Sequence, residues 1–178
     1  MKNIFKKAIA LAMLTLLIGL NSVNVFAGVK TTIEKGKEKG EEKSIVDIAT
    51  SDARFTTLVK ALQAADLVDT LKNDGQFTVF APTDEAFQKL GADKVNELLK
   101  PENKEALKDI LLYHVARKEI LADKVVKLNG KELNMLNNKK AKIEVKNNEA
   151  YIDGAKIIIT DIRAKNGIIH VIDAVMVP

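Results

Sequence analysis

The 178-residue chain contains no cysteine and no tryptophan, and it has only three prolines, two tyrosines and six phenylalanines. The absence of cysteine excludes disulfide bonds, thiolate metal sites, a cysteine nucleophile and lipid attachment through a cysteine. Stability must therefore come from packing. Hydrophobic residues make up 47% of the chain and charged residues 29%. These values are typical of globular proteins and argue against a disordered, collagen-like or multi-span membrane protein.

Long hydrophobic runs are also scarce, and the main one lies at the N-terminus. Three lysines within the first seven residues precede an apolar run over residues 8–20, and small side chains follow at Val25 and Ala27. This order is typical of a cleavable secretory signal, and the run is shorter than the roughly 20 residues that a membrane-spanning helix needs. We predict a signal peptide over residues 1–27, no permanent membrane anchor, and a secreted protein in the extracellular space, periplasm or cell envelope.

An excess of positive charge is lacking once the signal is removed. The whole chain carries a formal net charge of +4, and loss of residues 1–27 leaves 25 basic and 24 acidic side chains. Without a basic excess or aromatic stacking residues, nucleic acid is not an expected partner. Residues 28–43 alternate in charge with few apolar side chains, which predicts a flexible charged leader. Residues 44–178 are then the folded domain, which we expect to be a monomer.

In the first half of this domain, apolar residues recur at the spacing of amphipathic helices. Phe55, Leu58, Val59 and Leu62 follow the i, i+3, i+4, i+7 spacing of an amphipathic helix. Residues 76–81 form a short apolar segment that is stopped by Pro82, which predicts a buried strand. Thr83 and Asp84 can cap a following helix. Further helical spacings place His114 on the apolar stripe of a helix that begins near Pro101.

Beyond about residue 119 the period changes to two, as in strands. Asn129-Gly130 favours a tight hairpin between residues 125–126 and Leu133. Residues 141–146 alternate between apolar and charged side chains, which indicates a strand with one buried face and one solvent-exposed face. Residues 157–159 and 168–177 are apolar on both faces and are predicted to be central strands. Helices followed by strands indicate an α+β fold rather than an alternating parallel sheet.

Three stretches carry a family resemblance. The first is FTVFAPTDEAF over residues 77–87, the second is Tyr113-His114, and the third is NGIIHVIDAVMVP over residues 166–178. Together, in this order and across about 135 residues, they resemble the fasciclin domain family. The resemblance implies a single fasciclin-like domain over residues 44–178, with an N-terminal helical half packed on a C-terminal β-rich wedge or sandwich.

The resemblance also implies a function. Fasciclin domains are adhesion modules of cell surfaces and extracellular matrix, so we expect a non-enzymatic binding protein. Its partner would be an unidentified cell-surface or matrix protein or polysaccharide. The segments associated with partner binding in animal relatives correspond here to Tyr113, His114, Asp161 and Ile162.

The spacing of the remaining polar residues indicates whether they could act as metal ligands, bases or nucleophiles. The two histidines, His114 and His170, could be metal ligands or general bases, but each lies in an apolar segment and is expected to be a buried, hydrogen-bonded imidazole. Asp173 follows His170 by three, so the two side chains lie on opposite faces of a strand. Ser44 and Ser51, the two serines after the signal, lack a nucleophile-elbow setting. We expect no catalytic residue, no metal and no cofactor.

One basic patch remains. Lys139, Lys140 and Lys142 have the form of a heparin-type site, and Lys140 and Lys142 would point the same way on a strand. The competing interpretation is that these lysines guard an exposed strand edge, because Glu144 and Glu149 lie close by in the sequence.

Two hypotheses of function follow. The first is an exported, non-enzymatic adhesion or protein-binding module. The alternative is an envelope carrier that holds a small apolar or cofactor-like ligand in a cleft between the helical layer and the sheet.

Overall fold

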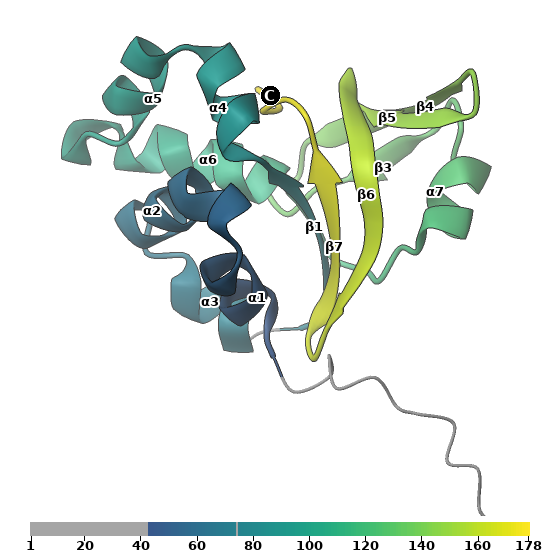
Figure 1. Cartoon of the computed structure of the whole chain (residues 1–178), viewed down its shortest axis with the longest axis horizontal. Helices are drawn as coiled ribbons and strands as arrows, with labels where there is room; N and C mark the ends of the chain where they lie inside the picture. The colour runs from purple at the N-terminus through teal and green to yellow at the C-terminus, as the bar shows by residue number, and fades with distance from the viewer. Residues whose placement is uncertain (1–42, 74) are drawn as a thin grey trace, which may run out of the picture. The chain divides into compact units, whose positions relative to one another are not determined.

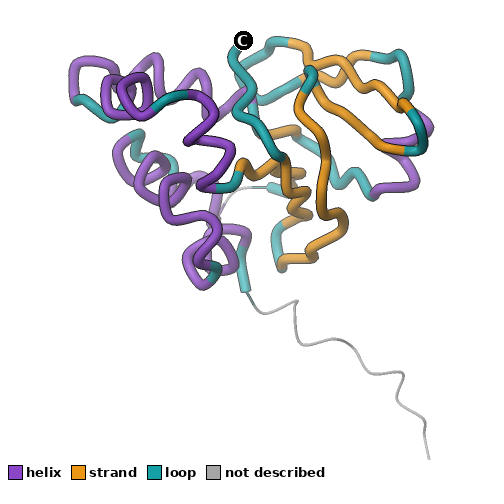
Figure 2. The backbone as a smooth tube through the Cα atoms, turned by 45° about the horizontal axis from the view of Figure 1, so that its top comes forward, coloured by secondary structure: helices purple, strands orange, loops and turns teal. Residues whose placement is uncertain are grey.

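Helices and strands occupy separate layers in the computed structural model, which describes residues 43–73 and 75–178 (Figures 1 and 2). Helices α1 to α6 lie on one side of strands β1 and β7, and strands β3 to β6 lie on the other side together with α7. The predicted signal peptide, residues 1–27, and nearly all of the predicted leader, residues 28–43, lie outside the described residues. The α+β fold with a helical N-terminal half is confirmed.

Most helices and strands are short. The helices are α1 (Ile45–Ser51), α2 (Thr56–Ala64), α3 (Val68–Asn73), α4 (Asp84–Leu90), α5 (Ala92–Leu98), α6 (Lys104–Tyr113) and α7 (Ala122–Lys127), with 3₁₀ turns at Ala53–Phe55 and Pro101–Asn103. The strands are β1 (Phe77–Pro82), β2 (Val115–Ala116), β3 (Glu132–Asn134), β4 (Lys140–Lys146), β5 (Glu149–Ile152), β6 (Ala155–Ala164) and β7 (Gly167–Ile172). Among the described residues, no helix is both long and apolar enough to span a bilayer.

Side-chain caps fix where helices α1 and α4 begin. Ser44 and Asp47 form a reciprocal capping box at the start of α1. Thr83 accepts a hydrogen bond from the Ala86 N–H at the start of α4, as its position after the strand predicts. Asp84 accepts from the Thr57 N–H at 2.7 Å, so α4 also caps α2. These caps therefore set the starts of α1 and α4 and the contact between α4 and α2.

The seven strands form one sheet in the order β2-β1-β7-β6-β5-β4-β3. β1 and β7 pair in parallel, and the other neighbouring strands pair antiparallel. An isolated bridge between Ala116 and Met135, with the Leu136 N–H donating to the Val115 carbonyl at 2.7 Å, joins the two outer strands. The sheet therefore curls back on itself around its own interior.

Two hydrophobic clusters lie on opposite faces of β1 and β7. Val79 and Ile169 face the helices, whereas their neighbours Phe80 and Ile172 face the interior of the curled sheet. Successive strand residues point to opposite faces, so a strand buried on both faces needs an unbroken apolar run. The prediction of a central strand is confirmed for β7. That strand ends at Ile172, so its predicted continuation over residues 173–177 is wrong, and Val177 is 57% exposed.

The predicted hairpin at Asn129-Gly130 is wrong. Val125 and Val126 belong to helix α7, and Gly130, with φ of 76°, lies in the turn that follows this helix. The reason is the spacing of the buried positions, since Leu121, Val125 and Leu128 are buried or half-buried and recur every three or four residues, as on one face of a helix, while Val126 is 51% exposed. A two-residue apolar pair does not distinguish this one-sided helix from a strand.

Candidate functional site

Tyr113 joins the helical layer to the curled sheet. It ends α6, is 4% exposed, and its hydroxyl group lies 3.0 Å from the Lys140 carbonyl oxygen and 3.1 Å from Asp153 Oδ2. Burial, with a further contribution from the Asp153 carboxylate, raises the pKa of Tyr113 to about 12. The phenol therefore stays protonated and donates to these oxygens.

His114 is buried and holds both of its ring nitrogens in hydrogen bonds. Nδ1 lies 2.8 Å from the Ile110 carbonyl oxygen, and Nε2 accepts from the Met176 N–H at 3.0 Å. A carbonyl can only accept, so Nδ1 carries the proton and the ring is neutral. Burial lowers the pKa of His114 to about 4. The imidazole thus ties α6 to the C-terminal segment.

His170 has the opposite tautomer. Its Nε2 lies 2.7 Å from the Ile120 carbonyl oxygen, so this nitrogen donates, and Nδ1 accepts from the Asp161 N–H at 3.3 Å. Its ring stacks on Phe80 with centroids 5.5 Å apart, and burial lowers its pKa. The expectation that both histidines are buried and hydrogen-bonded is confirmed.

Asp161 and Ile162 lie at an irregularity of β6. The register of β6 against β7 shifts twice, between Ile157 and Ile159 and between Ile159 and Ile162. Asp161 takes a positive φ of 61°, and its Oδ1 accepts from the Ala122 N–H at 2.9 Å, at the start of α7. Ile162 is half-buried against the cluster beneath the helices.

These bulges leave apolar side chains exposed. The prediction of a central strand at residues 157–159 is confirmed by the sheet order, but Ile158 is 46% exposed and Ile159 is 36% exposed, so this apolar segment is not buried on both faces. β5 pairs with β6 only at Lys156 and Ala155, and in the described part of the chain no strand pairs with that edge of β6 beyond Lys156. The strand is therefore central in the sheet order but carries a free edge.

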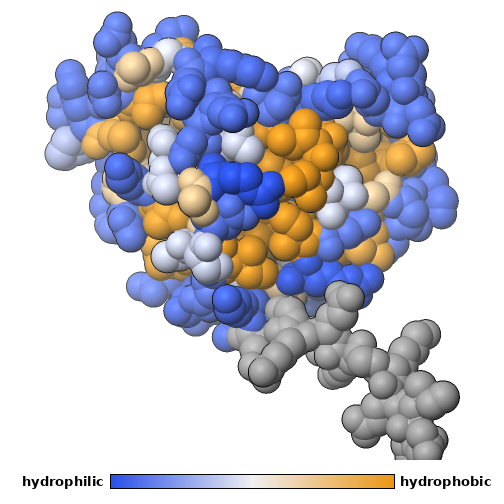
Figure 3. Space-filling model, viewed as in Figure 1, coloured by the Kyte–Doolittle hydropathy of each residue, from blue (hydrophilic) through white to orange (hydrophobic). Residues whose placement is uncertain are grey.

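We define the β6 surface as the exposed and half-buried residues around this free edge. Ile159 pairs with Val171, which faces the helices, so Ile159 lies on the helical side of the sheet. Figure 3 shows apolar surface over β6 and β7 on that side, surrounded by hydrophilic residues. Ile158 lies on the α7 side, where it lines a hollow of about 450 Å³ together with Val126. The β6 surface consists of Val126, Ile158, Ile159, Thr160, Asp161 and Ile162.

The lysines of the predicted basic patch are paired with acids. Lys139 binds Asp109 at 2.8 Å. Lys140 binds Glu132 at 3.0 Å, and Lys142 binds Glu144 at 2.9 Å. Lys140 and Lys142 are both exposed on the same side of β4, as predicted. The acidic partners neutralise most of the charge of these lysines. The structure therefore favours the interpretation that the lysines protect an exposed strand edge from pairing with another chain.

The described residues hold little else that suggests chemistry. No three His, Cys, Asp or Glu side chains among them cluster as metal ligands would. Between the helices and the central strands, the space lined by Phe55, His114 and Ile169 has a volume of about 20 Å³. Such a space holds at most one water molecule.

Comparison with known proteins identifies the family to which this fold belongs. A family model described as the fasciclin domain matches residues 53–178. The chain belongs to the fasciclin domain family.

Relatives of this fasciclin domain occur in bacteria and animals. Two proteins of Synechocystis sp., Protein sll1483 and Uncharacterized protein sll1735, are each 44% identical to it over 135 residues. The alignments cover 76% of this chain and 73% of the first protein, and 75% of this chain and 96% of the second. Transforming growth factor-beta-induced protein ig-h3 of Oryctolagus cuniculus is 36% identical over 76% of this chain, which corresponds to 19% of that longer protein.

A solved structure has the same fold. It is a FAS1 domain pair from the insect cell adhesion molecule Fasciclin I, which matches with a TM-score of 0.68 and 24% sequence identity over 76% of this chain and 51% of that chain.

The partner-binding residues predicted from the sequence include Asp161 and Ile162 of the β6 surface but not Val126 and Ile158 of this fasciclin domain. Their exposure depends on the two bulges of β6 and on α7. The only available signal was the crowding of apolar residues at 157–159 followed directly by polar Thr160 and Asp161, which does not fit the strict alternation of a regular strand.

Proposed function

We propose that this protein is an exported, non-enzymatic adhesion module that binds a protein of the cell surface or extracellular matrix through the β6 surface. The observation that carries the proposal is the exposure of Ile158 and Ile159 on a free strand edge, beside Asp161 and Ile162. Soluble domains rarely leave large apolar side chains together in water, and such patches are typical of protein interaction sites.

The free edge supplies a second kind of contact. Backbone N–H and C=O groups of an unpaired strand can bind an extended segment of another protein, while neighbouring side chains give specificity. Ile158 and Ile159 alternate across the strand, so one docked segment would meet apolar side chains on both faces. This arrangement suits a protein partner better than a small molecule.

The residues of the family resemblance then have distinct roles. Asp161 and Ile162 belong to the β6 surface itself. Tyr113 and His114 are 4% and 2% exposed, so we propose that they act as positioning residues. Tyr113 fixes the hairpin formed by β4 and β5, and His114 fixes the C-terminal segment beside β7.

Two further observations support the proposal. The N-terminal sequence has the pattern of a secretory signal, which agrees with an exported module. Both imidazoles are committed to structural hydrogen bonds and stay neutral near pH 7, which agrees with a non-enzymatic role. The enclosed space between the helices and the central strands measures only about 20 Å³. The larger hollow of about 680 Å³ between α6 and β1 is open and carries the charged side chains Asp66, Lys108 and Arg117, which suits a small apolar ligand poorly, so we put forward the adhesion module rather than the carrier.

The test removes apolar side chains from the β6 surface while keeping strand β6 itself. In the Ile158→Thr/Ile159→Thr variant, β-branched threonine keeps the strand preference but loses apolar surface. The intact protein is used to capture partners from surface and matrix fractions of the source cell. We expect the double variant to lose at least about tenfold in affinity for the captured protein, since each buried isoleucine contributes on the order of 1 kcal/mol or more.

Val177→Thr is the matched control, because Val177 is 57% exposed and lies outside the β6 surface. It should capture the same protein as the wild type. Amide hydrogen exchange at Ile158 to Thr160 should also slow when the partner is bound, because a docked segment covers this edge. Equal capture by wild type and double variant, with unchanged exchange along β6, would exclude the β6 surface as the binding site.

A further inference from the structure

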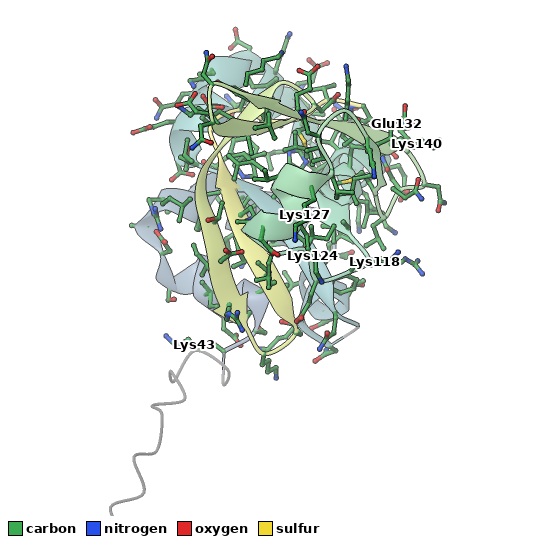
Figure 4. All side chains as sticks on the ribbon, turned by 90° about the vertical axis from the view of Figure 1, so that its right-hand side faces the viewer. Lys43, Lys118, Lys124, Lys127, Glu132 and Lys140 are labelled. Carbon is green, nitrogen blue, oxygen red and sulfur yellow. The ribbon has the colours of Figure 1, made fainter. Side chains whose placement is uncertain are left out.

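A groove on another part of the domain carries unpaired positive charge. It has a volume of about 700 Å³ and lies between the segment that follows β2, the end of α7 and β3. We call it the basic groove and define it by its five cationic side chains: Arg117, Lys118, Lys124, Lys127 and Lys131. Figure 4 shows Lys124 and Lys127 on α7 beside Lys118, with Glu132 and Lys140 further along.

Few acids offset these charges. Only Glu119 and Glu132 line the same groove, and Glu132 is already paired with Lys140 at 3.0 Å. Lys127 lies 3.6 Å from Asp123, in a pair that is well exposed to water on both sides. Within the described ranges, the other four cations of the groove form no ion pair. This differs from Lys139, Lys140 and Lys142, which are all paired.

The wall of the groove is held by buried polar groups. Thr78, which is 0% exposed, donates to the Lys118 carbonyl at 2.5 Å and accepts from the Ile120 N–H at 2.8 Å. The Ile120 carbonyl in turn accepts from His170 Nε2. Arg117, Lys118 and Glu119 therefore project from a backbone that is fixed from inside the domain, and a ligand would not have to order it.

We propose that the basic groove binds a linear acidic polysaccharide, with carboxylate or sulfate groups against the cations. Leu128 and Leu133 provide an apolar lining between the charged rims, and this suits the C–H faces of sugar rings. The groove residues include no aromatic side chain, so the stacking platform of single-stranded nucleic-acid sites is missing there.

The basic groove also adjoins a second hollow, and a polymer needs such an extended binding path. Arg117 lines both the basic groove and a second open hollow of about 680 Å³, which contains Lys108 and the apolar residues Leu112 and Leu136. One acid, Asp66, also lines this hollow, and it is paired with Lys104. A chain of several sugar units can therefore pass from one hollow to the next along Arg117. A single small anion would occupy only a small part of this path.

The test measures binding of the full chain to two acidic polysaccharides, heparin for sulfate and polygalacturonate for carboxylate, by calorimetry in about 50 mM NaCl, where screening is modest. Lys118→Gln/Lys124→Gln/Lys131→Gln keeps most of each aliphatic stem and removes three charges. We expect this variant to bind at least one of the two polysaccharides about tenfold more weakly than the wild type does.

The control is Lys139→Gln/Lys142→Gln/Lys146→Gln, which changes the net charge equally but removes lysines that are paired with Asp109 or Glu144. We expect it to bind within about twofold of the wild type, since paired surface charges contribute little. Equal weakening by both triple variants, or no binding of either polysaccharide, overturns the proposal. Binding of poly-L-glutamate or a short DNA duplex as tightly as the polysaccharides overturns the assignment to sugar.

Discussion

Gly167 shows how one residue decides the alignment of strands far apart in the chain. It starts β7 opposite Phe77 of β1, with φ of 149°, in a region that other residues rarely adopt. A Cβ atom at this position would lie 2.0 Å from the Phe77 carbonyl oxygen and 2.8 Å from the Phe77 nitrogen. The absence of a side chain is therefore what allows β1 and β7 to begin their parallel pairing side by side.

Gly167→Ala should lower the free energy of unfolding by about 3 kcal/mol or more, because backbone atoms must move and the strained φ remains. Urea denaturation measures this change. Gly154→Ala is the matched control, since Gly154 has φ of 82° but no atom within 4 Å of the added carbon. It should cost about 1 kcal/mol from the backbone conformation alone. Equal losses in the two variants would contradict the role of the close approach to Phe77.

At the scale of elements, α7 depends on a side chain from a distant strand. The helix has six residues, no side-chain cap of its own at Leu121, and an N-terminal N–H group at Ala122 that donates to Asp161. Isolated helices of this length are not stable in water. The β6 bulge at Asp161 thus holds α7 in place, and with it one wall of the basic groove and Val126 of the β6 surface.

Asp161→Ala should destabilise the protein by about 1 kcal/mol and speed hydrogen exchange at the amides of α7, because the helix loses its acceptor. Asp161→Asn keeps an oxygen at the same position and tolerates the positive φ, so it should preserve most of the protection. Unchanged exchange in α7 after the alanine substitution would show that other contacts hold this helix.

Strand β4 behaves as its sequence predicts, because alternation of apolar and charged residues fixes which face is buried. Ala141 and Ile143 are 0% exposed, whereas Lys140 and Lys142 are exposed. The hairpin predicted at Asn129-Gly130 failed because its evidence was a turn dipeptide alone. Turn residues end helices as well as strands, and only packing against the second cluster made Val125 helical.

For the whole molecule, the two buried histidines couple stability to pH. The folded state keeps His114 neutral with a pKa of about 4, below its usual 6.5, and burial shifts the pKa of His170 in the same direction. The unfolded chain therefore binds more protons as pH falls from 6.5 to 4, and stability present above pH 6.5 is lost across this window. His114 alone should account for about 3 kcal/mol of that loss.

Urea denaturation at pH 7.5 and at pH 4.5 tests this coupling. The wild type should be less stable at the lower pH. His114→Gln should be less stable than the wild type at pH 7.5, because buried hydrogen bonds are disturbed, but its stability should change less with pH. A pH dependence as steep in the variant as in the wild type would show that other groups cause the loss.

Patterns local in the chain determined much of this protein. Apolar spacing, caps and strand alternation gave the helical first half, β1, β4 and β7, and three short stretches gave the fasciclin family. The tertiary structure decided the parallel pairing of β1 with β7, the bulges of β6 and the closure at Met135, because each depends on contacts between residues distant in sequence. The β6 surface and the basic groove arise from those contacts, since exposure and charge pairing are properties of neighbours in space.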